Sequence, residues 1–73
     1  MYKKAKECIC KENIGSLYDL CHQYNQPFNI KTTFLNCLLI KINNNKAEFL
    51  IEGSVYNCDF QSEDYCVYAK KSK

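Results

Sequence analysis

The sequence predicts an α+β fold in which one short helix packs on a curved antiparallel sheet of four to five strands. Three observations lead to this prediction. Apolar residues recur at three- and four-residue steps over 17–25, they alternate with other residues over 28–42 and in later segments, and residues that favour reversals separate these segments. With 73 residues, the chain is expected to form a single domain, 1–73.

The segment 17–25 has the pattern of a short amphipathic helix. The Ser16 hydroxyl can cap free N–H groups at a helix start, and Asp19, three residues later, completes a box-like pair. The residues that would share one face of this helix are Leu17, Leu20, Cys21 and Tyr24. Asn25 and Pro27 then favour a stop.

From residue 28 the period of the pattern changes to two, which predicts one long or bent strand, or two short ones, through residue 42. One side of this strand would carry Phe28, Ile30, Thr32, Phe34, Asn36, Leu38, Ile40 and Ile42. The stretch 34–39 is apolar on both sides, and 34–42 would also suit a helix. The asparagines 43–45 predict a tight reversal, because asparagine tolerates the left-handed conformation that such turns require.

Three shorter strands are expected after this reversal, the first of them paired back as a hairpin. Their inward residues would be Ala47, Phe49 and Ile51, then Tyr56, Cys58 and Phe60, then Tyr65, Val67 and Ala69. Bends are expected at 52–54 and 61–64. Residues 2–12 fit either a strand or a helix, and their many lysines and glutamates favour helix.

The expected order of one helix and four or five short antiparallel strands resembles the layout of small SH3-like and Sm-like barrels. The resemblance covers the order of elements alone, because the sequence lacks the glycine and aspartate signatures of the Sm family. It therefore implies no function.

Charge is unevenly distributed along the chain. The net charge is +2, with lysines gathered near both termini and an acidic excess between them. Arginine is absent, so bidentate clamps on guanine or phosphate are excluded, and nucleic acid is not the favoured partner. The start of the chain lacks a secretory apolar segment and no apolar run is long enough for a membrane span, so a cytoplasmic location without membrane contact is expected.

The six cysteines are the most unusual feature of the composition: Cys8, Cys10, Cys21, Cys37, Cys58 and Cys66. The leading interpretation is that they are reduced and pack as small apolar residues, as cytosolic thiols do. A disulfide framework is one alternative. A zinc site of Cys8, Cys10, Cys21 and His22 is another, although their spacing differs from that of paired zinc ligands. No metal or cofactor is therefore predicted.

Tyrosines and acidic residues are the candidate binding residues. Tyrosine supplies a large contact area at low entropic cost, and an acidic surface can meet a basic partner. The predicted partner-binding residues are Tyr2, Tyr18, Tyr24, Tyr65 and Tyr68, together with Glu48, Glu52, Glu63 and Asp64. Ordinary half-buried tyrosines and a solvated acidic surface are the alternative interpretations.

No catalytic motif is recognisable, so the leading prediction is a small non-enzymatic interaction protein. The abundance of residues with AT-rich codons favours an inhibitor encoded by a phage or mobile element, which binds and blocks a host defence or regulatory protein. A homodimer is also considered, because so small a core supplies little stability. The alternatives are a small ligand-binding module for a nucleotide or single-stranded nucleic acid, and a thiol- or zinc-dependent small protein.

Overall fold

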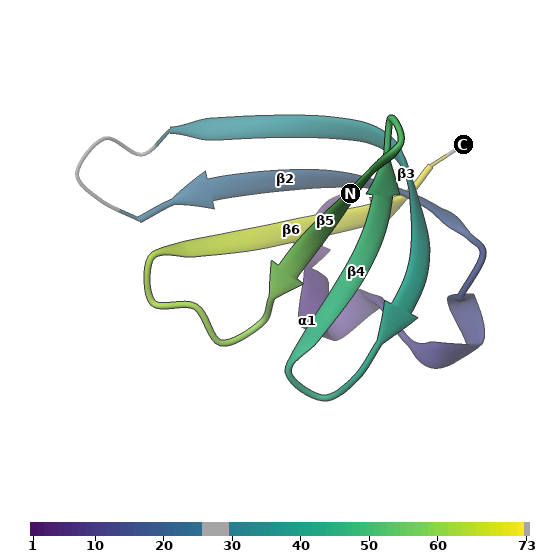
Figure 1. The fold of residues 1–73 in the computed structure, drawn as a ribbon. Coiled ribbons are helices and arrows are strands. Elements are labelled where there is room, and N and C mark those ends of the chain that lie inside the picture. Colours follow the sequence, from purple (N-terminus) through teal and green to yellow (C-terminus); the bar gives the residue numbers. More distant parts are fainter. Residues whose placement is uncertain (26–29, 73) are drawn as a thin grey trace.

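The computed structural model describes residues 1–25 and 30–72 and shows a six-stranded antiparallel sheet with a short helix near the N-terminus (Figure 1). In chain order the elements are β1 (Lys3–Lys4), α1 (Ala5–Cys8), the 3-10 helix η1 (Lys11–Asn13), β2 (Leu17–Tyr24), β3 (Lys31–Ile42), β4 (Lys46–Ile51), β5 (Ser54–Asp59) and β6 (Tyr65–Lys71). The strands lie in the order β1-β6-β2-β3-β4-β5. The α+β class is confirmed, but the sheet has six strands instead of four to five.

The predicted helix over 17–25 is wrong, because this segment forms strand β2. β2 lies between β3 and β6 and pairs with both along most of its length. Alternate residues share its inner face, which carries Tyr18, Leu20, His22 and Tyr24. The sequence does not show this period of two clearly, because the inner face includes the polar His22 and the outer face includes the apolar Leu17 and Cys21. Pairing with β3 and β6 on its two sides is what makes this segment a strand.

Helix forms instead within the ambiguous segment 2–12. α1 is a single turn that packs against β1 and β6. It places Ala5 in the core, and Ile9, the residue that follows the helix, is also buried there. The Tyr18 hydroxyl donates to the Cys8 carbonyl at 3.4 Å, which ties the end of α1 to the start of β2. The preference of this segment for helix is thus confirmed in part.

β3 confirms the predicted long strand, but a β-bulge interrupts its period of two near the middle. Between Tyr18 and Leu20 the pairing of β2 with β3 shifts, so that Leu35 and Asn36 together face Asp19. Asn36 has a φ of 56°, a conformation that asparagine tolerates, and its N–H donates to Asp19 Oδ1 at 3.1 Å. A bulge of this kind re-aims the side chains that follow it.

The predicted single face of β3 is therefore wrong. Phe34 lies on the inner face before the bulge, whereas after it Cys37 and Leu39 point inward and are fully buried. Leu38 and Ile40, expected beside Phe34, consequently lie on the outer face. A second register shift after Leu39 returns Ile42 to the core. Phe28 and Pro27 lie outside the described residues.

The remaining strands and turns agree with their predictions. The Asn43 side chain accepts hydrogen bonds from the N–H groups of Asn45 and Lys46 at 2.8 and 3.0 Å and so closes the reversal into β4. Glu52 and Gly53, with φ of 49° and 82°, form the two-residue turn into β5. Positive φ at both positions matches the right-handed twist of the paired strands.

The core lies on the concave inner face of the sheet. Its buried residues are Ala5, Ile9, Tyr18, Leu20, Cys37, Leu39, Ala47, Phe49, Cys58, Val67 and Ala69. The predicted inward residues Phe34, Phe60 and Tyr65 are partly buried and pack against this cluster. In the described part of the chain, no helix is long and apolar enough to cross a membrane.

Candidate functional site

The outer face of the sheet carries a row of aliphatic side chains that crosses four strands. Leu17 of β2 is the partner of Leu38 in β3, Leu38 is the partner of Leu50 in β4, and Leu50 is the partner of Val55 in β5. Directly opposed residues have their side chains on the same face of a sheet. We call these four residues the outer row, which spans about 15 Å across the strands.

The outer row is exposed to solvent over much of its surface. Leu17 is 44%, Leu50 is 37% and Val55 is 54% exposed, while Leu38 between them is half-buried. Two further apolar residues on this face of β3, Ile40 and Leu35, are also exposed. Isolated exposed apolar residues are common on proteins, but a contiguous apolar patch marks a contact surface.

Charged residues border the outer row. Lys41 of β3 and Glu48 of β4 are directly opposed, one step along the strands from the aliphatic residues. An apolar centre with a polar rim is the usual arrangement of a protein contact surface. The predicted binding residue Glu48 belongs to this rim, while Glu52 lies exposed in the turn at the other end of β4.

A second candidate region is the cluster of aromatic rings at the end of β2 and the start of β6. The His22 ring stacks on Tyr65 with centroids 4.2 Å apart and lies 4.8 Å from the tilted ring of Tyr24. His22 Nδ1 lies 2.6 Å from the Tyr56 hydroxyl, and Tyr56 packs in turn on Phe34 with centroids 5.6 Å apart. We call these five residues the aromatic cluster.

The surroundings of His22 in this cluster favour its neutral imidazole form. Burial lowers the pKa of His22, since the charged ring would lose its hydration there. Its Nε2 is buried and has no hydrogen-bond partner among the described residues. Burial also raises the pKa of Tyr56, so the pair remains uncharged. The arrangement suits packing and places no charged acid or base at the surface.

The acidic residues Glu63 and Asp64 lie beside the exposed end of this cluster. The Asn25 N–H donates to the Asp64 carbonyl, and the Asn25 side-chain amide donates to the Glu63 carbonyl, both at 3.0 Å. These bonds hold the loop before β6 against the end of β2. Together with Tyr24, this loop lines a shallow acidic recess.

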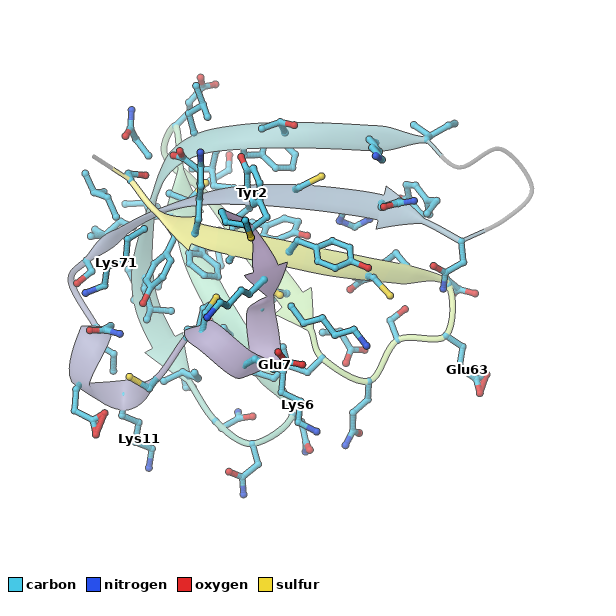
Figure 2. The ribbon with its side chains drawn as sticks, turned by 180° about the vertical axis from the view of Figure 1, so that it is seen from behind. Tyr2, Lys6, Glu7, Lys11, Glu63 and Lys71 are labelled. Carbon is cyan, nitrogen blue, oxygen red and sulfur yellow. The ribbon has the colours of Figure 1, made fainter. Side chains whose placement is uncertain are left out.

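The opposite end of the sheet is basic. Lys3, Lys70 and Lys71 line an open recess of about 700 Å³, and Lys70 Nζ lies 5.0 Å from the centroid of the Tyr2 ring. Figure 2 shows Lys71 and Glu63 at opposite ends of the molecule. The predicted site residue Tyr68 lies on β6, in register with Lys4 of β1.

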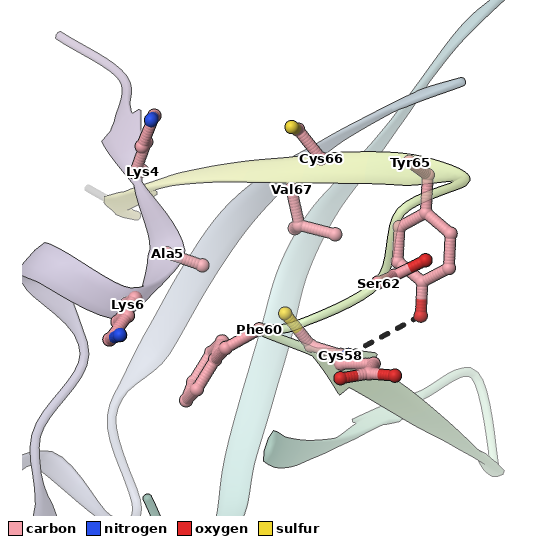
Figure 3. Close-up of a pocket in the computed structure, with 10 residues that line it drawn as sticks. Lys4, Ala5, Lys6, Cys58, Phe60, Ser62, Tyr65, Cys66 and Val67 are labelled. Carbon is pink, nitrogen blue, oxygen red and sulfur yellow. Dashed lines mark hydrogen bonds between the residues drawn. The ribbon is translucent and has the colours of Figure 1, made fainter. Parts of the chain in front are cut away.

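A pocket of about 280 Å³ lies between β5 and β6, where the two strands are not paired with each other (Figure 3). Lys4, Ala5 and Lys6 form its wall on the α1 side. The Asp59 N–H donates to the Tyr65 hydroxyl at 3.4 Å across this gap. The pocket is small, and its polar side chains converge on no single point, so it provides no evident ligand site.

All six cysteines are free thiols. Cys37 and Cys58 are fully buried, and burial raises the pKa of Cys37 to about 11 and that of Cys58 to about 12. The four residues of the considered zinc site do not gather, since Cys21 and His22 project from opposite faces of β2. Within the described ranges, no group of three or more potential metal-ligating side chains is found.

The predicted binding residues do not form one surface. Tyr18 is buried, with only 1% of its surface exposed, and its ring packs edge-on against that of Phe49 with centroids 6.1 Å apart. The assignment of Tyr18 to an exposed patch is therefore wrong. The others divide among the acidic end, the basic end, the rim of the outer row and, for Glu52, the turn after β4. Sequence reasoning missed the outer row; of its four residues, only Leu38 lies in the stretch 34–39, which is apolar on both sides of the strand.

Comparison of this chain with protein-family models, with curated proteins and with solved structures finds no match.

Proposed function

We propose that this protein is a small non-enzymatic interaction protein that binds a surface of a larger protein through its outer row. The observation that carries the proposal is the line of Leu17, Leu38, Leu50 and Val55 across four strands. Burying apolar surface contributes about 25 cal/mol per Å², so covering these side chains would be favourable.

The rigidity of the sheet supports this role for the outer row. Leu38, Leu50 and the strands that carry them are held by partners on both sides, and the residues between them on the inner face are fully buried. A surface whose backbone is already ordered loses little entropy when a partner covers it. The rim residues Lys41 and Glu48 would then select a partner with complementary charges.

At a finer level, we propose that the partner is a host defence or regulatory protein and that the chain is a phage or mobile-element inhibitor acting in the cytoplasm. The abundance of residues whose codons are rich in A and T supports this assignment. An inhibitor of this kind needs no reactive centre, because occupying the partner's surface is sufficient.

The experiment is a comparison of matched variants in a capture assay from a low-GC bacterial lysate. Leu50→Lys places a charge in the outer row, whereas the control Thr33→Lys places the same charge on the outer face of β3, beyond the row. We expect the wild-type protein and Thr33→Lys to retain the same partner, and Leu50→Lys to lose it. Capture that survives Leu50→Lys, or no captured partner at all, would contradict the proposal.

A second candidate function is binding of a nucleotide or a short single strand at the basic recess. The observation that favours it is that Lys3, Lys70 and Lys71 line this recess, and Lys70 Nζ lies 5.0 Å from the centroid of the Tyr2 ring. The test is a titration with fluorescent oligonucleotides at rising salt. Salt-sensitive binding that Lys70→Gln and Tyr2→Ala both weaken would support this function, and no binding at low salt would exclude it.

We also propose that the sheet follows the layout of SH3-like and Sm-like barrels. A short helix before five longer strands, and the Tyr65 to Asp59 hydrogen bond across the gap between β5 and β6, support this resemblance. The layout carries no functional inference by itself.

A further inference from the structure

The two edges of the sheet differ in how they are protected. β1, at one edge, is two residues long and both are lysine, a short charged form that discourages association with other edges. β5, at the other edge, is six residues long. Its stretch 54–57 contains neither a charged residue nor a proline. The β5 edge therefore lacks the usual protection.

The hydrogen bond made by Phe60, the residue after β5, shows which residues of β5 bond to β4 and which face the open side. Bonding directions alternate from residue to residue along an antiparallel strand. The Phe60 N–H donates to the Asn45 carbonyl at 2.9 Å, on the β4 side. The even-numbered residues Ser54, Tyr56 and Cys58 accordingly bond to β4.

The odd-numbered residues of β5 turn their backbone groups to the open side. The Asp59 N–H is already occupied by the Tyr65 hydroxyl. For Val55 and Asn57, no hydrogen bond on this side is found among the residues that the structure describes. Both residues are exposed, so their N–H and C=O groups are accessible to another strand.

We propose that the β5 edge pairs with the β5 edge of a second copy of this chain, antiparallel about a two-fold axis at Tyr56. In this register Val55 is opposite Asn57 of the partner subunit, and Asn57 is opposite Val55 of the partner subunit. The two residues of each pair exchange two backbone hydrogen bonds, so the N–H and C=O groups that Val55 and Asn57 turn to the open side all gain a partner. Asp59 keeps its bond to Tyr65.

The side chains at this edge fit a second copy as well as the backbone does. Val55 is the last member of the outer row, and in this register it lies diagonally beside Val55 of the partner subunit, within reach across the new strand pair. The two outer rows thereby approach each other on one face of a continuous sheet. No charges oppose each other over 54–57. Self-association is a usual source of stability for a core this small.

The test measures the oligomeric state of the full chain by sedimentation equilibrium over a range of concentrations. Asn57→Pro removes an N–H for which no hydrogen bond is found among the described residues, and proline is tolerated at such an edge position. Val55→Lys adds a charge to the edge, and Thr33→Lys is the matched control away from it. We expect a dimer for the wild-type protein and for Thr33→Lys. Both edge variants should weaken dimerisation by about tenfold or more.

Two spectroscopic measurements keep the test decisive if a variant folds poorly. In the wild-type protein, exchange of the Val55 and Asn57 amides should slow as the concentration rises, while exchange of the Thr33 amide should not change. In a mixed sample with half of the chains carbon-13 labelled, we expect an intermolecular contact between the Tyr56 Hα atoms of the two copies. In antiparallel sheets, these atoms approach closely across a non-hydrogen-bonded pair.

A wild-type protein that remains monomeric, or a dimer that Asn57→Pro and Val55→Lys leave intact, would overturn the proposal. This inference goes beyond the proposed function, because β5 pairing leaves the outer row open to a partner. The two can fail separately: a monomer that still loses its captured partner in Leu50→Lys rejects only the dimer. A dimer without any captured partner rejects only the interaction through the outer row.

Discussion

His22 is a polar residue built into the apolar side of the sheet. Its neighbours on the inner face are aromatic, and its Nδ1 is satisfied by the Tyr56 hydroxyl at 2.6 Å. Burial lowers its pKa from 6.5, so the unfolded chain binds a proton more readily than the folded protein at mildly acidic pH. Protonation of His22 therefore opposes folding.

The stability of the protein should depend on this one group near pH 6. We expect the contribution of neutral His22 to be fully present above about pH 6.5 and to be lost as the pH falls toward its folded-state pKa. Urea unfolding at several pH values, for the wild-type protein and for His22→Gln, measures the difference. An equal pH dependence for both proteins in this window would contradict the assignment.

The thiols should react at very different rates. Cys10 is exposed, whereas Cys37 and Cys58 are fully buried and their raised pKa values leave almost no thiolate at neutral pH. We expect iodoacetamide to label Cys10 first and to reach Cys37 and Cys58 only when the chain unfolds. Mass spectrometry of the labelled peptides, with a fully denatured sample as control, checks this order. Native labelling of Cys58 as fast as Cys10 would be inconsistent with the structure.

The turns and the later strands were predictable from sequence, and β2 was not. The reversals at 43–45 and 52–54 depend on local residues whose conformational preferences act wherever they occur. β2 depends instead on partners distant in the sequence, because it pairs with β3 and with β6. Its spacing of apolar residues fits a helix by chance, and tertiary pairing overrides such local preferences.

The bulge in β3 explains why the candidate site was only partly predictable. The acidic rim residue Glu48 could be identified, but the outer row could not, because the change of face after Asn36 moves Leu38 outward. The bulge depends on Asp19 of the neighbouring strand β2. Its Oδ1 accepts hydrogen bonds from the Asn36 N–H and from the Ser72 hydroxyl. Such a long-range requirement leaves no periodic signal along the sequence.

The turn between β4 and β5 provides a test at this scale. Glu52 has a φ of 49°, which costs a residue with a Cβ about 1 kcal/mol or more, and asparagine adopts this conformation more readily. We expect Glu52→Asn to raise the free energy of unfolding by up to about 1 kcal/mol, as measured by urea denaturation.

Gly53→Ala is the matched counterpart in the same turn. Apart from its chain neighbours, a Cβ on Gly53 would meet no atom of the described residues within 4 Å, so its effect comes from the backbone at φ 82°. This substitution should lower the free energy of unfolding by about 1 kcal/mol. Destabilisation by Glu52→Asn, or no effect of Gly53→Ala, would show that the turn has another conformation.

The buried inner face of the sheet and its exposed outer face should contribute very differently to the stability of the protein. Leu20 is fully buried in the core, whereas Leu50 lies in the outer row. A chain this short is expected to have a stability of only about 3 to 5 kcal/mol. The loss of one large core side chain, typically about 2 to 5 kcal/mol, is therefore comparable with the total.

Leu20→Ala should accordingly leave much of the protein unfolded at room temperature, as judged by circular dichroism and urea titration. Leu50→Ala should change the free energy of unfolding much less, by about 0.5 kcal/mol, because its side chain contributes little to the core. Similar losses for the two variants would mean that the outer row supports the fold rather than a contact surface.

The pairing of β1 with β6 sets Lys3 directly across from Ala69, so the first and last strands run side by side. A short glycine-rich linker could therefore join the two ends without stretching the sheet. New ends opened within the asparagine reversal at 43–45 would give a circularly permuted chain with the same strand neighbours.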